Sequence, residues 1–235
     1  MSRTRYLARV ISSGDLATRP LPPYRDTYPV LLCDGSGLEL PLQPFPDNQM
    51  AIALLMSNQT PFAVEAHLVP LLVELACTFA PEAIVGIPTL GLDYARLVAQ
   101  QLGFADYVAL GNSRKFWYSD RLAVPVVSVT SPDANKFLYL DPALVDRIAG
   151  KRTLIVDDVI NTGGTAIAAI QLLTLAGANG VGLVVALTEG YAWKTALDQQ
   201  VPGWSERVKG VGHIPLFQPA DQAGDRLWVP VPDTL

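Results

Sequence analysis

Short apolar runs alternate with helix-forming stretches through the middle of the chain. Four runs have the length and composition of buried strands, at residues 83–87, 107–110, 153–156 and 181–187. Between them, residues 92–101 and 165–176 predict helices, and Gly103 and Gly177 stand where glycine commonly ends a helix. Strands that alternate with helices predict a parallel sheet covered on both faces.

The segments before and after these core strands have a different pattern of apolar residues and prolines. Residues 61–80 carry apolar side chains at helical spacing and predict a helix. Residues 1–48 are rich in proline, so we expect irregular structure there, apart from a short strand at 29–33 that turns back into 38–40. The tail from about residue 199 is also predicted to be irregular.

Between the second and third core strands the pattern is less regular. Residues 125–130 and 136–140 resemble a hairpin around a turn at 131–135. Residues 144–148 predict a brief helix that ends before Gly150.

Composition restricts the class of protein. The chain has 235 residues, of which 50% are hydrophobic and 17% are charged, so a sizeable core is predicted and disorder is not. The net charge of -5 argues against broad nucleic-acid binding, which needs a positive surface. A small phosphorylated ligand is compatible with this charge, because a few local amides and cations suffice to bind it.

We expect a soluble cytoplasmic protein. No stretch approaches the roughly 18 apolar residues of a membrane span. The arginines at Arg3, Arg5 and Arg9 are not followed by the apolar run of a signal peptide. A disulfide between Cys33 and Cys77 is possible by count, but we expect two buried thiols in a reducing compartment.

One segment combines acidic and glycine-rich character. In residues 154–165, an apolar strand runs into Asp157 and Asp158 and leaves through a loop rich in hydroxyls and glycine. The carboxyl edge of a parallel sheet is where such folds bind ligands. The helix that follows has free N-terminal amides, and its dipole favours an anion. Gly163 and Gly164 allow close backbone approach, so this loop suits a phosphate.

The two carboxylates indicate a second kind of ligand group. They repel a phosphate, whereas carboxylates beside a phosphate site commonly accept from sugar hydroxyls or hold a metal-bound water shell. Thr162 and Thr165 add hydroxyl donors on the phosphate side. A phosphate on one side and a diol on the other describe a ribose 5-phosphate.

Other chemical signatures fit poorly. No lysine stands in the loop, which excludes the P-loop pattern, and no glycine triplet of the dinucleotide type follows a strand. His67 and His213 lack metal-ligand spacing, so we interpret both as structural. The alternative is an ordinary strand–loop–helix connection with incidental acids, but adjacent acids at the end of an apolar strand are costly to keep without use.

The segment resembles the signature of the type I phosphoribosyltransferases, in which an apolar strand is followed by two acids, two apolar residues, a variable residue and Thr-Gly-x-Thr. Every fixed position is met, and a looser resemblance extends over about residues 83–190. It implies an α/β fold, with a parallel sheet flanked by helices and a small irregular hood from the N- and C-terminal segments. We therefore expect residues 1–60 to form part of the hood, 61–198 the phosphoribosyltransferase core, and 199–235 a tail that is a further candidate for the hood.

The resemblance also assigns roles to neighbouring loops. It implies that a loop at 86–91 binds diphosphate through backbone amides, often with a strained or cis peptide. Its expected contacts are Thr89, Leu90 and Gly91. Arg114 and Lys115 would reach the diphosphate, Lys115 in a catalytic role, and residues 116–139 look like the mobile loop that closes over the substrate. This loop pattern most resembles the xanthine and adenine members.

The implied reaction transfers ribose 5-phosphate from phosphoribosyl diphosphate to a nitrogenous base, purine-like rather than pyrimidine, and releases diphosphate. Positioning and electrostatics would carry most of the catalysis through an oxocarbenium-like state. Mg²⁺ would be held mainly through substrate and water, with few protein ligands. Asp157 and Asp158 would bind the ribose hydroxyls, partly through the metal shell. The expected 5-phosphate contacts are Asn161, Thr162, Gly163, Gly164 and Thr165.

The base side is less sharply marked. In purine-using relatives the region of Glu189 and Tyr191 lies beside the base, and Tyr191 either stacks on a ring or packs within the protein. Hypoxanthine-using relatives place an acid at the position of Asn161, where it takes a proton from the base. An amide cannot do this, so either the base arrives deprotonated, or another group serves, or the purine assignment is wrong. Relatives are commonly homodimers.

Two other readings stay open. A regulator with this fold would bind phosphoribosyl diphosphate or a nucleotide without turnover, although the acidic charge disfavours a nucleic-acid-binding partner domain. An amidotransferase or a phosphoribosyl diphosphate synthase relative fits less well, because the chain lacks an N-terminal cysteine nucleophile and is short for paired synthase domains.

Overall fold

The functional layer of the protein is a parallel sheet. The computed structural model describes residues 8–19, 21–126, 136–220 and 227–235. Within them, five strands pair in the order β11-β10-β9-β5-β6, and every pair is parallel. These strands are β5 (Ala83–Gly86), β6 (Val108–Ala109), β9 (Arg152–Ile160), β10 (Asn179–Glu189) and β11 (Val208–Ile214). The predicted α/β fold with a parallel sheet is confirmed.

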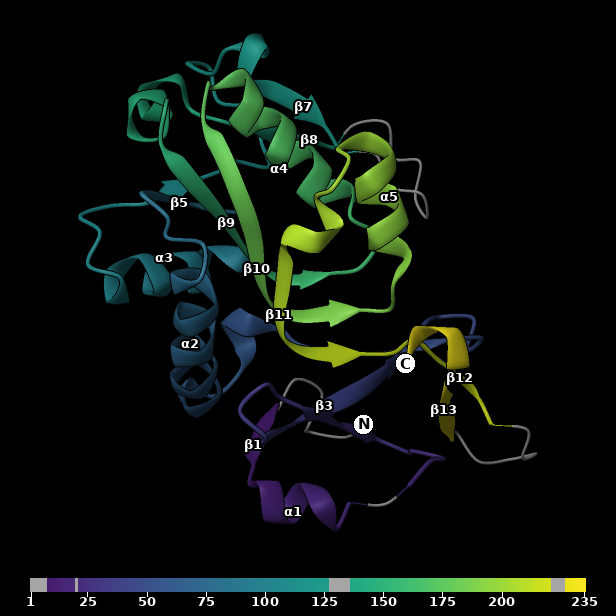
Figure 1. Cartoon of the computed structure of the whole chain (residues 1–235). Coiled ribbons are helices and arrows are strands. Elements are labelled where there is room, and N and C mark those ends of the chain that lie inside the picture. The colour runs from purple at the N-terminus through teal and green to yellow at the C-terminus, as the bar shows by residue number, and fades with distance from the viewer. Residues whose placement is uncertain (1–7, 20, 127–135, 221–226) are drawn as a thin grey trace.

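Helices cover both faces of this sheet (Figure 1). One face packs against α2 (Phe62–Cys77) and α3 (Gly91–Gln101), and the other against α4 (Gly164–Leu175) and α5 (Ala192–Gln200). The helices predicted at 61–80, 92–101 and 165–176 are confirmed. Pro61 is the N-cap of α2, where its lack of an amide proton costs no hydrogen bond.

A second sheet, antiparallel throughout, lies below the parallel sheet in Figure 1. Its strands pair in the order β1-β3-β4-β12-β13, and β2 also pairs with β3. They are β1 (Arg9–Ile11), β2 (Thr27–Leu31), β3 (Gly37–Pro44), β4 (Ala51–Ala53), β12 (Phe217–Pro219) and β13 (Trp228–Pro230). Both ends of the chain therefore contribute to one sheet.

This second sheet corrects the expectation that residues 1–48 and the tail are irregular. Proline is tolerated because it stands at strand ends, on a strand with one partner, or, for Pro41 inside β3, where the pairing of that strand passes from β2 to β4. Pro44 ends β3, and Pro29 lies in β2, whose only partner among the described strands is β3. A strand with one partner leaves every second amide out of the ladder, and proline fits such positions.

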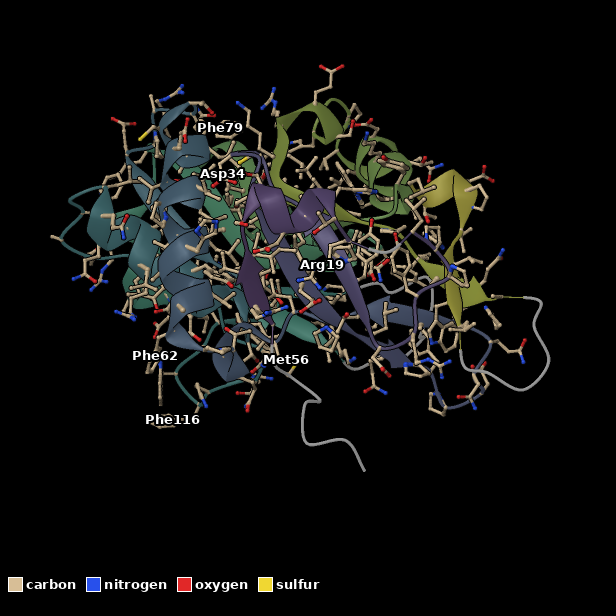
Figure 2. All side chains as sticks on the ribbon, turned by 90° about the horizontal axis from the view of Figure 1, so that it is seen from below. Arg19, Asp34, Met56, Phe62, Phe79 and Phe116 are labelled. Atoms are coloured by element: carbon tan, nitrogen blue, oxygen red, sulfur yellow. The ribbon has the colours of Figure 1, made fainter. Side chains whose placement is uncertain are left out.

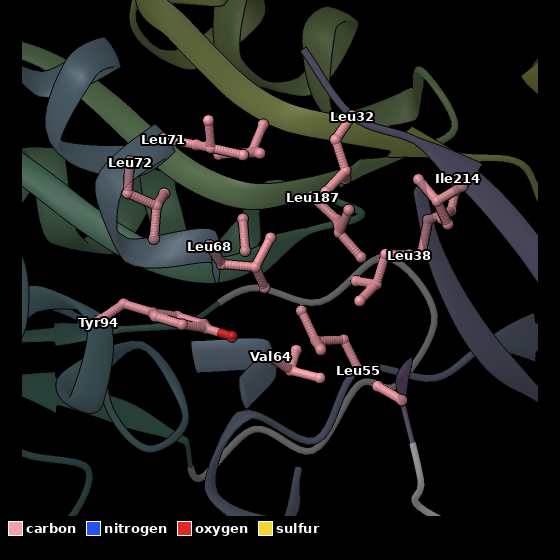
Figure 3. Packing of buried hydrophobic residues seen from close by; sticks show 14 of the residues in the cluster. Leu32, Leu38, Leu55, Val64, Leu68, Leu71, Leu72, Tyr94, Leu187 and Ile214 are labelled. Carbon is pink, nitrogen blue, oxygen red and sulfur yellow. The ribbon is translucent and has the colours of Figure 1, made fainter. Parts of the chain in front are cut away.

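The two sheets share one apolar core. Figure 3 shows Leu68 and Leu72 of α2 close to Leu187 of β10, with Leu38 of β3 on the facing side. All four are fully buried. A backbone bridge between Leu32 and Gly212 also joins the two sheets. The second sheet and the parallel sheet therefore share a continuous hydrophobic core. The division of the chain into units at residues 60 and 198 stays a proposal.

The tail contributes a strand that the sequence pattern did not predict. β11 lies at one edge of the parallel sheet and pairs with β10 from Leu183 to Glu189. Its sequence contains Gly210 and Gly212, which lower its apolar content. The glycines allow close packing, because a Cβ on Gly212 would stand 2.9 Å from side-chain atoms of both Leu187 and Leu32. The unpredicted helix α5 precedes it.

The remaining elements are short. The hairpin prediction is confirmed in its second strand, β8 (Phe137–Tyr139), which pairs antiparallel with β7 (Ala123–Pro125). The first strand was predicted at 125–130 and begins two residues earlier, while residues 127–135, which include the predicted turn, lie outside the described residues. The brief helix expected at 144–148 is a 3-10 helix, η3 (Pro142–Arg147). The others are α1 (Ser13–Ala17), η1 (Ser57–Gln59), η2 (Asp120–Leu122), η4 (Ser205–Arg207) and η5 (Pro232–Thr234).

Two further findings concern membrane-spanning helices and the state of the two cysteines. Within the described ranges, no helix combines the length and the hydrophobicity that crossing a bilayer requires. The thiols of Cys33 and Cys77 are free but exposed, which corrects the expectation that they are buried. Each lies where the chain leaves a structured element, after β2 and at the end of α2.

Tyr94 supplies a prediction about stability. Its side chain on α3 is 1% exposed, and its hydroxyl, seen in Figure 3, has no hydrogen-bond partner in the described part of the chain. A buried polar group without a partner costs about 1–3 kcal/mol. Tyr94→Phe is therefore expected to raise the free energy of unfolding by up to about that amount. Chemical denaturation measures it, and a loss of stability would show that the hydroxyl has a partner in solution.

Candidate active site

The acid pair lies inside β9 rather than after it. We expected the strand to end at Val156, but the strand continues to Ile160, and Asp157 is in register with Val185 of β10. Pairing with β10 keeps the backbone extended past the acids. Both carboxylates therefore project from a strand held by its neighbours, close to the carboxyl edge of the sheet.

The start of α3 packs directly onto Asp157. A Cβ on Gly91 would stand 2.4 Å from the Oδ1 of Asp157 and 2.7 Å from its Cα, which is closer than real Cβ contacts occur. Only glycine fits at this position. The same Oδ1 accepts a hydrogen bond of 2.9 Å from the backbone amide of Asp158. The carboxylate is thus held by the backbone next to it and covered by the first turn of α3.

Burial makes the acid pair electrostatically unfavourable in the protein alone. The side chain of Asp157 is buried, and that burial raises its pKa well above the usual range, with the neighbouring Asp158 adding to the effect. Burial also raises the pKa of Asp158. Both shifts disfavour the ionised form, so a cation or a hydroxyl donor at this point would stabilise the carboxylates.

A small pocket follows the acid pair. Its volume is about 130 Å³, and it is lined by Asp157 and by the segment 159–166. Gly163 is the N-cap of α4 and has a φ of 83°, a left-handed conformation that favours glycine. No side chain caps this helix, so its first amides are available to an anion. The structure therefore brings together the residues predicted to bind a 5-phosphate.

The loop between β5 and α3 is held from two sides. The peptide bond between Pro88 and Thr89 is cis, the geometry that the family resemblance anticipated. Ser57 donates a hydrogen bond of 2.8 Å from its Oγ to the carbonyl of Leu90. The Nδ2 of Asn112 donates to the Oγ1 of Thr89 at 3.2 Å. The loop is thereby tied to η1 and to the segment that follows β6.

Sequence reasoning missed both of these supports. Ser57 is buried, but it lies in a segment without periodic pattern, and nothing in its spacing marks it. Asn112 carries a signal in the sequence, because it is a polar residue that closely follows a core strand and precedes the basic pair.

The basic pair lies on an exposed segment. The guanidinium of Arg114 forms an ion pair with Asp120 at 2.9 Å, and the side chain of Lys115 is exposed without a hydrogen bond or ion pair in the described part of the chain. The next residues are aromatic: Phe116 is 96% exposed and Trp117 is 52% exposed. Figure 2 shows Phe116 projecting from the rim of the molecule. Contact of this segment with a diphosphate stays a prediction.

A second cluster of polar side chains lies at the carboxyl ends of β10 and β11. The ring of Tyr191 is stacked on His213, with 4.8 Å between centroids, and its hydroxyl donates to the carbonyl of Leu235 at 2.8 Å. His213 also contacts the Oγ1 of Thr188 and the carbonyl of Thr234. These contacts agree with a structural role for His213. They also engage the ring of Tyr191 within the protein, so base stacking by Tyr191 stays a proposal.

Glu189 ends β10 and is 6% exposed. Burial raises the pKa of its carboxyl to about 7. Because Thr188 is in register with Ile160, Glu189 lies level with Asn161, the first residue of the loop 161–165. His67, the other isolated histidine, contacts Ser36 at 2.7 Å, away from this edge of the sheet.

Fold and site together define an α/β protein with a glycine-rich loop beside an acid pair at the carboxyl edge of its sheet. The profile of the family described as "Phosphoribosyl transferase domain" matches residues 72–213, which is more than half of the chain. The chain therefore belongs to the phosphoribosyltransferase family.

Individual relatives agree with this assignment. The adenine phosphoribosyltransferase of Kineococcus radiotolerans is 34% identical over 143 residues, which is 57% of this chain and 71% of that protein. The one from Streptomyces galbus is 59% identical over 46 residues, 20% of this chain and only 25% of that protein. The orotate phosphoribosyltransferase of Oceanobacillus iheyensis is 35% identical over 101 residues, 40% of this chain and 48% of that protein.

The fold also occurs in a solved structure. The adenine phosphoribosyltransferase of Thermoanaerobacter pseudethanolicus superposes with a TM-score of 0.59 at 16% identity, over 74% of this chain and 95% of that one. At this identity the likeness concerns the fold alone.

The contact at Gly91 generates a prediction. Gly91→Ala places a Cβ against the backbone of Asp157, so the start of α3 and β9 must separate. We expect the free energy of unfolding to fall by about 1–3 kcal/mol, as for other overpacked sites. Gly14→Ala is the control, because the nearest atom to its Cβ would be 3.8 Å away. Equal effects of the two substitutions in chemical denaturation would contradict the close packing at Asp157.

Proposed function

We propose that the protein is an enzyme that transfers ribose 5-phosphate from phosphoribosyl diphosphate to a nitrogenous base and releases diphosphate. The observation that carries this proposal is the acid pair, with Asp157 buried and Asp158 partly buried, beside the uncapped start of α4. An anion site next to two carboxylates matches a phosphate and a sugar diol on one molecule. Family membership agrees with it, although the Streptomyces relatives are matched over only a quarter of their length.

Each loop then has a part in binding the donor. The amides of the segment 161–165 hold the 5-phosphate, and the carboxylates of Asp157 and Asp158 accept from the ribose hydroxyls. The loop formed by Thr89, Leu90 and Gly91 offers backbone amides to the diphosphate, with Arg114 and Lys115 closing from the opposite side. The leaving diphosphate and the ribose are thus held by different groups of the protein. The charges that develop on them in the transition state are stabilised by groups already in position.

The acid pair also fits Mg²⁺ as a cofactor. Within the described residues, no group of three or more histidine, cysteine or acidic side chains is placed to hold a metal ion. Two adjacent carboxylates match an ion that keeps several waters and is bound mainly by substrate oxygens. When bound, Mg²⁺ supplies neutralisation of the leaving diphosphate. Asp157 and Asp158 would hold its water shell and orient the ribose hydroxyls.

The acceptor is proposed to be a purine-like base. Adenine phosphoribosyltransferases are prominent among the relatives, and the amide at Asn161 does not supply the acid that hypoxanthine-using members carry. The base would lie near Glu189 and Tyr191, at the ends of β10 and β11. We further propose that the enzyme acts in the cytoplasm as a homodimer.

The central test is the double variant Asp157→Asn with Asp158→Asn. Diphosphate release with a panel of bases is expected to fall at least about a hundredfold, as when preorganised electrostatic groups are lost elsewhere. The fold should be retained, because amides remove two charges whose burial is unfavourable at neutral pH. If the unmodified protein binds phosphoribosyl diphosphate saturably but shows no turnover with any base, it is a regulator instead.

Asp146→Asn is the matched control, since Asp146 is an exposed acid on η3. It should leave diphosphate release unchanged. Full activity in the double variant would refute the role assigned to the acid pair.

A further inference from the structure

Ser57 is a buried serine whose hydroxyl acts on a loop that is distant in the chain. It is 7% exposed, and its Oγ donates a hydrogen bond of 2.8 Å to the carbonyl of Leu90. Because hydrogen bonds are directional, this contact fixes where the carbonyl of Leu90 points. Ser57 precedes residues 72–213, the part of the chain that the family profile matches, so the family pattern does not account for it.

The direction of this carbonyl also determines the direction of an amide. The cis peptide bonds of the described residues are Pro22–Pro23 and Pro88–Thr89, so the peptide between Leu90 and Gly91 is trans. In a planar trans peptide, the carbonyl oxygen and the amide proton point in opposite directions. The amide of Gly91 therefore points away from Ser57 and from η1.

The glycine at position 91 makes such a contact necessary. The close approach of Asp157 leaves no room for a Cβ there. Glycine, however, allows a wide range of backbone angles, so the peptide next to it is poorly fixed by local sterics. The hydroxyl of Ser57 supplies the restraint that a side chain on residue 91 would otherwise give.

The amides of this loop are available to a ligand. In the described part of the chain, the amides of Thr89 and Leu90 donate no hydrogen bond. Gly91 is the first residue of α3, where amides lack a partner within the helix, and no side chain caps this helix. Successive free amides at the start of a helix suit an anion that carries several oxygens.

The two contacts that hold the loop act on different groups. Asn112 donates to the side-chain hydroxyl of Thr89, which leaves the proton of that hydroxyl free for an acceptor. Ser57 instead bonds to the backbone. A change at Ser57 therefore affects the orientation of a peptide, whereas a change at Asn112 affects the orientation of a side chain.

We propose that Ser57 is a positioning residue, which holds the carbonyl of Leu90 so that the amide of Gly91 is aimed at the diphosphate of the donor. This inference rests on the proposed function in placing diphosphate at the loop 89–91. Its effect is confined to the diphosphate end, because the 5-phosphate and the ribose are assigned to other residues. It also makes binding of the donor depend on the second sheet, since η1 follows β4 closely in the chain.

The test measures equilibrium binding of two probes, magnesium diphosphate and ribose 5-phosphate, to the full chain and to Ser57→Ala. The first probe uses the loop 89–91, and the second uses the loop 161–165 and the acid pair. We expect Ser57→Ala to weaken diphosphate binding about fivefold to tenfold, the effect of losing one hydrogen bond. The dissociation constant of ribose 5-phosphate should stay within about twofold, because its contacts are independent of Ser57.

Two further variants separate positioning from general stability. Ser205→Ala is the matched control, because it also removes a serine hydroxyl that donates a hydrogen bond, here to Asp198, but before the amino end of β11. It should alter neither dissociation constant. Ser57→Cys keeps the size of the side chain with a weaker donor, so it should weaken diphosphate binding less than Ser57→Ala does.

The outcomes distinguish this inference from the proposed function. Equal diphosphate binding by Ser57→Ala and the unmodified protein, or an equal loss for both probes, overturns the role of Ser57 even if turnover is intact. A loss confined to diphosphate, in a protein without turnover for any base, supports the inference and refutes the proposed function alone. If Ser57→Ala does not fold, the same comparison of the two probes in Ser57→Cys decides.

Discussion

The contact between Gly91 and Asp157 is the constraint on which the site depends. Because no Cβ fits between them, the first turn of α3 lies directly on β9. This contact determines how far the loop after β5 stands from the acid pair. The loop between β5 and α3 and the strand that carries the carboxylates thus meet at one junction, and Ser57 and Asn112 hold that loop by hydrogen bonds from outside.

The electrostatics of the site follow from the same close packing. Asp157, Asp158 and Glu189 are all sheltered from water, and burial raises the pKa of each carboxyl. None of these groups is in its most favourable environment in the protein alone. The pair in β9 is suited to a ligand that brings positive charge or hydroxyl donors, and the carboxyl at the end of β10 stands apart from that pair on the neighbouring strand.

The sequence was informative where structure is local. The runs at 83–87, 153–156 and 181–187 are almost wholly apolar, so their strands were predictable, and the acid–glycine segment identified the family. In the second sheet only the hairpin of β2 and β3 was predicted, from the strand at 29–33 that turns back into 38–40. The other strands were missed because they are short and pair with partners far away in the chain. β11 was missed for the same reason: its glycines look like loop residues until Leu187 and Leu32 are packed against them. Ser57 and the burial of Glu189 depend on tertiary contacts that no local pattern records.

The pairing of β4 with β12 has a consequence for the order in which the molecule is assembled. β4 is made early, but its partner at Phe217 follows more than 160 residues later, after all five strands of the parallel sheet. During synthesis on the ribosome, the acid pair and the loop 161–165 emerge while one edge of β4 is still without its partner strand. The part of the second sheet that contains Phe217 is therefore added last. A chain interrupted before β12 would leave the apolar side chains that Phe217 covers exposed to solvent and to chaperones.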